Sequence, residues 1–227
     1  MIIAKDLSLI YPDGTIGLEN VNIEIIAGEV VFITGPSGSG KTSFLKLLMG
    51  MEYPTSGSLS VLGQIIGKDS AKSIRKMRKL TGPIFQDFKL LKGRTVLENV
   101  LLGMRFLNIT KKQMIINATE SIERVGLKHK TNSLVDNLSY GECQRVAIAR
   151  AVSRKPSLII ADEPTGNLDK ENSLNILELL TSFKDKNTSV IITTHATHLI
   201  EDIAADVMVK VKKGNIEWER VAYESRI

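Results

Sequence analysis

The stretch GPSGSGKT at residues 35–42 limits the possible folds of this chain more than any other part of the sequence. Its glycines, Gly35, Gly38 and Gly40, allow the backbone to turn tightly, so that successive N–H groups point toward one place. The apolar run VVFIT comes directly before it, and KTSFLKLLMG, which begins within it, has helical spacing and a closing glycine. A strand, a glycine-rich turn and a helix in this order predict an α/β fold built on a parallel sheet.

The same stretch matches the phosphate-binding loop pattern, in which Gly and four further residues are followed by Gly-Lys and then Ser or Thr. We expect Lys41 to reach the β- and γ-phosphates of a nucleotide, and the hydroxyl of Thr42 to ligate Mg²⁺. A glycine-rich turn without a ligand is the alternative. The candidate nucleotide-binding residues are Gly35, Pro36, Ser37, Gly38, Ser39, Gly40, Lys41 and Thr42.

Two further continuous apolar runs end in residues that carry chemistry. SLIIADEP places Asp162 and Glu163 at the end of a predicted buried strand, and SVIITTH does the same for His195. Asp162 is expected to hold Mg²⁺ through water, and Glu163 to polarise an attacking water molecule, as hydrolysis requires. An imidazole at His195 could hydrogen-bond a γ-phosphate. The alternatives are a helix cap for the paired acids and a structural role for the histidine.

The remaining patterns place these motifs in one larger unit. The first thirty residues alternate apolar and polar side chains and contain the turn signal PDGT, which favours antiparallel strands, and GSLSVLGQII reads as another strand. TKKQMIINATESIERVGL has helical spacing with Thr110 as a plausible N-cap. We expect a single domain over residues 1–227, with a RecA-like and antiparallel-β core at residues 1–87 and 156–227. A helical subdomain at residues 88–155 interrupts this core.

The overall composition limits the possible partners and the cellular location of the chain. With 43% hydrophobic residues it can bury a sizeable core, and its net charge of +5 favours a negatively charged partner, without choosing between nucleotide, nucleic acid and lipid. Cys143 is the single cysteine, which excludes an intrachain disulfide and a cysteine-based metal cluster. The sequence has no apolar run of membrane-spanning length, and its start is charged too early for a signal peptide, so we expect a cytosolic chain. The basic stretch KSIRKMRK fits a solvated helix face or a phosphate-binding patch.

The chain contains, in this order, the motifs GPSGSGKT, LSYGE and LIIADEP, followed by His195. With this order of motifs it resembles the nucleotide-binding subunits of ABC systems over essentially its whole length. The resemblance implies ATP as the nucleotide and Tyr11, in IYPDG, as the ring that stacks on adenine. It implies that Gln86, in IFQD, links Mg²⁺ and the attacking water to the helical subdomain. It also implies a D-loop formed by Asn167, Leu168 and Asp169.

In ABC subunits the signature LSxGE acts in trans, so the resemblance implies a homodimer that encloses two ATP molecules. Each ATP is bound by the phosphate loop of one subunit and the signature of the other. The signature residues here are Ser139, Tyr140, Gly141 and Glu142. Tyr140 stands where the family often has glycine, and Cys143 stands where glutamine is frequent.

Among subfamilies, YPDGTIGLENVNIEI, FQDFKLL, TVLENV and DEPTGNLD look most like the cell-division ATPases of the FtsE type, with the lipoprotein-release and macrolide-export ATPases as near relatives. This implies ATP hydrolysis that drives an integral membrane partner, an FtsX-like permease, from the cytoplasmic face of the membrane. Phe88, Leu90, Leu91 and the helix in GRTVLENVLLG are candidates for the docking surface, and subdomain core is their alternative.

Two other classes of protein share the phosphate loop. DNA-repair relatives of ABC subunits carry a long coiled-coil insertion, whereas here only about a hundred residues without sustained heptads separate the loop from the signature, so no nucleic-acid partner is expected. A small-molecule kinase would leave the signature helix and Glu163 without a role. The sequence does not distinguish a role in cell division from a role in substrate export, because the ATPase subunits of both kinds of system use the same motifs.

Overall fold

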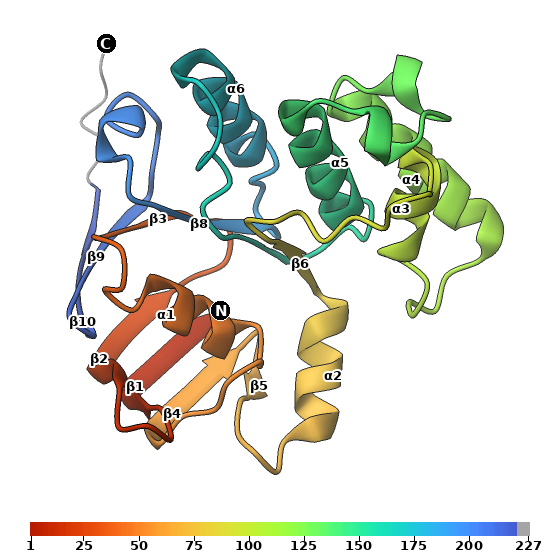
Figure 1. Ribbon diagram of the computed structural model, residues 1–227. Coiled ribbons are helices and arrows are strands. Elements are labelled where there is room, and N and C mark those ends of the chain that lie inside the picture. Colours follow the sequence, from red (N-terminus) through yellow and green to blue (C-terminus); the bar gives the residue numbers. More distant parts are fainter. Residues whose placement is uncertain (222–227) are drawn as a thin grey trace.

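The computed structural model describes residues 1–221, which form two sheets and a group of helices (Figure 1). The strands are β1 (Ile2–Ile10), β2 (Ile16–Ile25), β3 (Val30–Thr34), β4 (Ser56–Val61), β5 (Gln64–Ile65), β6 (Thr81–Ile84), β7 (Leu158–Ala161), β8 (Ser189–Thr194), β9 (Val207–Lys212) and β10 (Asn215–Arg220). The α-helices are α1 (Lys41–Leu48), α2 (Ala71–Lys79), α3 (Val96–Leu102), α4 (Lys111–Arg124), α5 (Tyr140–Val152) and α6 (Lys170–Thr181). Short 3-10 helices lie at η1 (Lys128–Lys130), η2 (Val135–Asn137) and η3 (Thr197–Leu199).

The larger sheet has the order β10-β9-β3-β8-β7-β6, and the neighbours from β9 to β6 are parallel. Every residue of β3, β7 and β8 is buried, as the continuous apolar runs predict for strands covered on both faces. Because these strands are parallel, their carboxyl ends meet at one edge of the sheet. The predicted α/β fold with a parallel sheet is confirmed.

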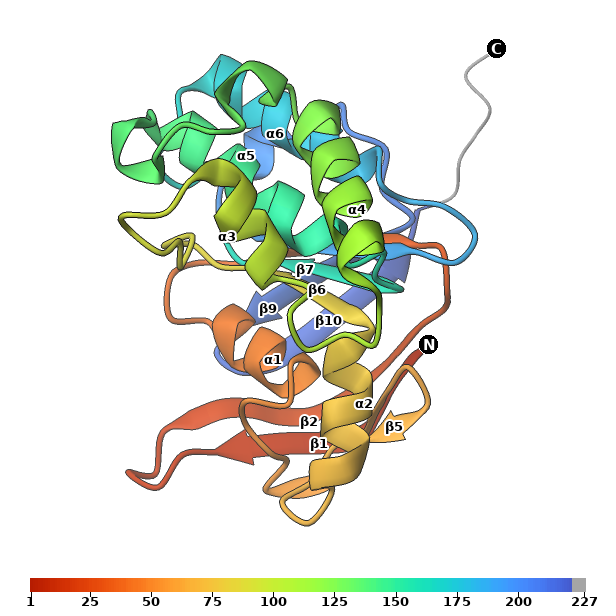
Figure 2. The same cartoon turned by 90° about the vertical axis from the view of Figure 1, so that its right-hand side faces the viewer.

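The smaller sheet is antiparallel, with the order β2-β1-β4-β5. Helix α1 lies between the two sheets (Figures 1 and 2) and buries Phe44, Leu45, Leu47 and Leu48 against both. GSLSVLGQII, expected to be one strand, is instead a hairpin of β4 and β5. Leu62 and Gly63 at its turn have φ values of 52° and 71°, and two consecutive positive φ angles reverse the chain in a tight turn.

Helices α3, α4 and α5 pack together on one side of the larger sheet. The predicted N-cap of α4 is confirmed, since the Thr110 side chain accepts a hydrogen bond from the Gln113 N–H. The segment at residues 95–155 is mostly helical, but it is not helical throughout. A stretch with two 3-10 helices separates α4 from α5, and Thr95 forms an isolated β-bridge with Leu134. This bridge satisfies backbone groups that no helix uses.

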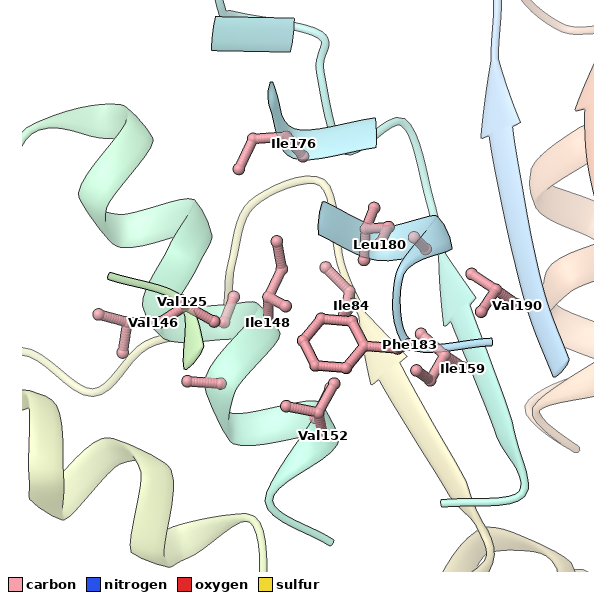
Figure 3. Close-up of a cluster of buried hydrophobic side chains, with 14 of the residues drawn as sticks. Ile84, Val125, Val146, Ile148, Val152, Ile159, Ile176, Leu180, Phe183 and Val190 are labelled. Atoms are coloured by element: carbon pink, nitrogen blue, oxygen red, sulfur yellow. The ribbon is translucent and has the colours of Figure 1, made fainter. Parts of the chain in front are cut away.

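Helix α5 is packed into the same hydrophobic cluster as the larger sheet (Figure 3). Val146, Ile148 and Val152 on α5 lie with side chains of α6 and of strands β6, β7 and β8 in one buried group. Each fully buried side chain of this kind contributes about 1.5–3 kcal/mol relative to its exposed state. The helix that begins at the signature is therefore anchored in the core. The division of the chain at residues 88 and 155 stays a prediction.

The basic stretch at residues 72–79 lies on α2. This helix buries Ile74 and Met77, and its lysines face solvent. Within residues 1–221, none of the helices combines the length and the apolar character that crossing a bilayer requires.

Candidate nucleotide-binding and hydrolysis site

The loop at residues 35–40 joins β3 to α1 in a conformation that depends on glycine. Gly35 has φ 150°, and a Cβ there would lie 2.3 Å from the Val211 carbonyl oxygen. Gly40 has φ 116°, and its Cβ would lie 2.5 Å from the carbonyl oxygen of Gly17. Any larger residue at either position would collide with backbone. The loop is thus held against β9 and β2 by two close approaches.

The N-terminus of α1 is open. Its N-cap is Gly40, and no side chain within residues 1–221 accepts a hydrogen bond from its first turn. Free N–H groups at a helix start favour an anion. The Lys41 ammonium lies over the loop and donates to the carbonyl oxygens of Gly35 at 2.8 Å and Pro36 at 3.1 Å. It also lies 3.4 Å from Oε1 of Glu163.

Asp162 and Thr42 meet beside this loop. The Asp162 carboxylate accepts a hydrogen bond from Thr193 Oγ1 at 2.8 Å, and the nearby Thr42 side chain acts to lower its pKa. Burial, reinforced by the neighbouring Glu163, raises the pKa of Asp162. A hydroxyl and a carboxylate side by side are hard oxygen ligands, so the residues present fit Mg²⁺.

Glu163 is fixed from three sides. Its backbone N–H donates to Thr193 Oγ1 at 2.9 Å, and its Oε2 lies 2.8 Å from Nδ1 of His195 and 3.3 Å from the His195 N–H. Its φ of 46° is unusual for a residue with a side chain, and such strain persists only where the surroundings enforce it. The carboxylate is held between an ammonium and an imidazole.

A cavity of about 550 Å³ brings these groups together. Of the candidates named from the sequence, it is lined by Tyr11, Pro36, Ser37, Gly38, Gly40, Lys41, Thr42, Gln86, Glu163 and His195. Gly35 and Ser39 lie behind this lining: the Gly35 carbonyl holds Lys41, and Ser39 is buried with an Oγ that has no hydrogen-bond partner among residues 1–221.

The cavity also contains residues that no sequence motif predicts. Thr15, Ile16, Gly17 and Ser43 line it, and the Tyr11 phenol shares a 3.0 Å hydrogen bond with Ser43 Oγ. Gly17 leaves room for the Tyr11 ring, because a Cβ there would lie 2.9 Å from Cε2 of that ring. Thr193 was missed as well, although a hydroxyl near the end of a fully buried strand is a signal that could have found it.

The signature residues Ser139 to Glu142 open α5 and do not line this cavity. Ser139 Oγ accepts a hydrogen bond from the Glu142 N–H at 3.2 Å, and Glu142 Oε2 accepts one from the Ser139 N–H at 2.8 Å. This capping box satisfies two N–H groups of the helix start. The hydrogen bond from the Ser139 N–H lowers the pKa of Glu142.

The predicted D-loop lies against the signature. The Asn167 side-chain amide donates to the Tyr140 phenol oxygen at 2.7 Å, and a Cβ at Gly141 would lie 3.7 Å from Leu168 Cδ2. Asp169 caps α6 by accepting a hydrogen bond from the Asn172 N–H at 2.9 Å. One turn along α5, Cys143 is half-buried, and burial raises the pKa of its thiol, which disfavours the reactive thiolate.

The candidate docking residues are split between surface and core. Phe88 and Leu90 pack against the main hydrophobic cluster, and Val96 and Val100 on α3 are fully buried. Leu91 is exposed and lines a second, smaller hollow with side chains of α3.

A separate cavity of about 640 Å³ lies between α2, β6 and the loop after α3. Its lining is Met49, Met51, Arg75, Arg78, Lys79, Thr81, Pro83, Phe85, Phe106, Leu107 and Arg154.

A sequence profile described as ABC transporter matches residues 18–166, from the second strand through both motifs that line the nucleotide cavity. This chain belongs to the ABC transporter family. It is 43% identical over 193 residues to the cell division ATP-binding protein FtsE of Mycobacterium tuberculosis, which covers 84% of this chain and 83% of that protein. It is 36% identical to the phosphonates import ATP-binding protein PhnC 2 of Halalkalibacterium halodurans, over 95% of this chain and 91% of that protein.

Solved structures agree with this assignment. A dimeric structure of the ATP-binding cassette MJ0796, in a post-hydrolysis state with ADP and phosphate, superposes with a TM-score of 0.85 at 30% identity. The match covers 98% of this chain and 99% of that one. The chain is therefore an ABC ATPase, the ATP-binding and hydrolysing subunit of a transporter-type complex, close to FtsE in sequence.

Proposed function

We propose that this chain dimerises around ATP and converts its hydrolysis into a conformational change of an FtsX-like membrane partner, at the cytoplasmic face of the cell membrane. The observation that carries the hydrolytic part is the position of Glu163, whose carboxylate lies in the cavity between Lys41 and His195. A carboxylate held in place beside a phosphate loop has the geometry of a general base.

Each lining residue then has a role in the reaction. The loop N–H groups and Lys41 bind the β- and γ-phosphates, and the Tyr11 ring stacks on adenine. Thr42 and Asp162, with Gln86, would hold Mg²⁺, which would neutralise charge on the phosphate oxygens when bound. Glu163 accepts the proton of the attacking water. His195 keeps the Glu163 carboxylate in place and offers its other ring nitrogen to the γ-phosphate.

The signature completes the site from a second copy of the chain. Ser139 and the N–H of Gly141 stand at the start of α5, where the helix dipole favours an anion. These residues do not line the cavity of their own subunit. In the proposed dimer, a second subunit supplies them to the phosphates. ATP thereby joins two copies, and hydrolysis releases them.

Replacing Glu163 by Gln tests the hydrolytic role, because the amide keeps the shape and loses the base. We expect turnover to fall by at least about a hundredfold while ATP binding persists. The ATP-bound variant should run as a dimer in size-exclusion chromatography with Mg²⁺. Turnover near the wild-type rate would show that another group is the base, and a strictly monomeric ATP-bound variant would contradict the dimer.

Similarity to FtsE supports the choice of partner. The large cavity beside α2 supports a docking role, because its lining combines apolar side chains such as Met51 and Phe106 with the basic side chains of Arg75 and Lys79. Phe106 is 84% exposed, which is unusual for so large an apolar side chain. A membrane partner could place an apolar segment with acidic flanks there.

The alternative is an ATPase subunit of a lipoprotein-release or macrolide-export transporter, which would use the same ATPase site. We propose a comparison by co-expression with the FtsX-type permease of the same genome and with an export-type permease. The FtsX-type protein should co-purify and stimulate ATP turnover, and Phe106→Asp should abolish both effects without changing the basal rate. Stimulation by the export-type permease alone would overturn the division role.

A further inference from the structure

Tyr140 touches two loops that are far apart in the sequence. Its ring packs edge-on against the ring of Phe88, with centroids 4.6 Å apart and planes at 62°. Its phenol oxygen accepts the 2.7 Å hydrogen bond from the Asn167 amide. A glycine at this position could make neither contact. The first residue of α5 therefore joins the loop after β6 to the loop after β7.

The loop after β6 is held in an unusual backbone conformation. Phe88 and Lys89 have φ values of 59° and 50°, which side chains disfavour. Arg150, ten residues further along α5 than Tyr140, donates to the carbonyl oxygens of both, at 2.6 Å for Lys89. Burial lowers the pKa of this guanidinium, so it has left much of its water for these partners. Helix α5 thus grips the loop at two points.

Both loops carry residues of the candidate site. Phe88 follows Gln86 by two positions, and Asn167 follows Glu163 by four. The loops also approach each other directly, since a Cβ at Gly166 would lie 3.8 Å from the Gln86 side-chain nitrogen. A change in the position of Tyr140 would therefore reach both Gln86 and Glu163 through short chain segments.

We propose that Tyr140 is a positioning residue for ATP hydrolysis. By tying Phe88 and Asn167 to the start of α5, it sets Gln86 and Glu163 of its own subunit and couples them to the signature. This rests on the proposed function, in which that signature closes the ATP site of the other copy. A subunit that contacts its partner through α5 then orders its own Gln86 and Glu163 at the same time. The two sites of the dimer therefore hydrolyse ATP cooperatively.

A double-mutant cycle tests the phenol contact. Tyr140→Phe keeps the ring against Phe88 and removes only the acceptor, and Asn167→Ala removes the donor. For each single variant we expect kcat for ATP to fall about three- to tenfold, the usual cost of one hydrogen bond. KM should stay within about twofold, because ground-state binding of ATP does not use this contact. The Hill coefficient should fall toward one, because the contact couples the two ATP sites of the proposed dimer. The double variant should be no slower than the slower single variant.

Cys143→Ser is the matched control, since Cys143 lies on the same helix and its thiol donates to the Val135 carbonyl oxygen, which belongs to neither loop. It should leave kcat, KM and the Hill coefficient unchanged. Fold-losses that multiply in the double variant, or a Tyr140→Phe enzyme with wild-type kcat and Hill coefficient, would overturn the proposal. The Glu163→Gln variant distinguishes failure of this proposal from failure of the proposed function. If that variant turns over ATP at the wild-type rate, or if it forms no ATP-dependent dimer, the proposed function itself is wrong.

Discussion

Two helices, α1 and α5, begin at the two motifs that the proposed reaction assigns to phosphate, and their N-termini are built in opposite ways. α1 starts at Gly40 in a left-handed conformation with no side-chain cap from residues 1–221. α5 starts at Ser139 in an extended conformation and carries a complete capping box with Glu142. One helix start offers free N–H groups, and the other has already satisfied two of its own.

This difference explains why one motif can bind a nucleotide alone and the other cannot. The open start of α1, with Lys41 beside it, has donors that gain partners only when an anion arrives. At α5 the Ser139 hydroxyl already accepts from the Glu142 N–H, and its own proton remains free to donate. The signature can thus add a hydrogen bond to a phosphate that is already held elsewhere, which suits a site completed by a second subunit.

The largest expected effect comes from removing the cation at the open helix. Lys41→Ala should weaken ATP binding by at least about a hundredfold, because charge-assisted bonds to phosphate are the strongest in such a site. Isothermal titration with ATP and Mg²⁺ measures this. Lys68→Ala, at an exposed position outside the cavity, is the control and should bind ATP normally. Equal affinity in both variants would mean that the open helix start alone holds the phosphates.

The second prediction attempts to turn α1 into a helix like α5. Gly40→Ser places a capping hydroxyl at the N-cap, but the backbone at φ 116° and the 2.5 Å approach to the Gly17 carbonyl do not admit its Cβ. We expect a loss of about 2–4 kcal/mol in the free energy of unfolding, measured with denaturant. Gly63→Ala, at a positive φ with no atom near its Cβ, should cost about 1 kcal/mol. Similar losses in both would contradict the steric explanation.

The third prediction separates the cap of α5 from its proposed contact with phosphate. Ser139→Ala should lower kcat about tenfold, while the affinity of the monomer for ATP stays unchanged. Thr95→Ala removes the matching capping box of α3. Both variants should lose about 1 kcal/mol of stability. Only the first should lose activity, and a comparable loss of activity in Thr95→Ala would reduce Ser139 to a structural cap.

The smallest expected effect concerns the charge within the capping box. Because the pKa of Glu142 is lowered in the folded chain, its carboxylate stabilises the fold above the ordinary value of 4.5, and this contribution disappears as the pH falls through the lowered value. Glu142→Ala should therefore cost about 0.5 kcal/mol at pH 7 after allowance for solvent screening, and less below about pH 4.5. Denaturant unfolding at both pH values measures the difference. A difference that is independent of pH would show that the charge has no part in the cap.

The sequence is informative about this fold wherever a residue's role depends on its neighbours in the chain. The phosphate loop, Asp162, Glu163 and the Thr110 cap could all be named because strand, turn and helix patterns are local. Thr193 was not predicted, because its hydrogen-bond partners Asp162 and Glu163 directly follow the adjacent strand β7, about thirty residues earlier in the chain.

The same limit applies to two other features. The hairpin of β4 and β5 was read as one strand, because Leu62 gives no sign that it can adopt a positive φ. The contact between Tyr140 and Asn167 joins side chains 27 positions apart in the chain. Such contacts depend on how α5 is placed on the sheet, and no periodic pattern records that placement.

Helix α5 has one further mechanical consequence, which follows from its buried half. Val146, Ile148 and Val152 fix its carboxyl-terminal part among strands and α6 (Figure 3). At its other end, the signature residues Ser139 and Tyr140 are exposed. The helix is about 20 Å long, given 1.5 Å per residue. The part that projects from Val146 to Tyr140 is about 9 Å long, so a rotation of about 10° at the core would move the signature by about 1.6 Å, roughly half the length of a hydrogen bond. Small adjustments in packing beneath α5 are then sufficient to make or break a contact at its tip.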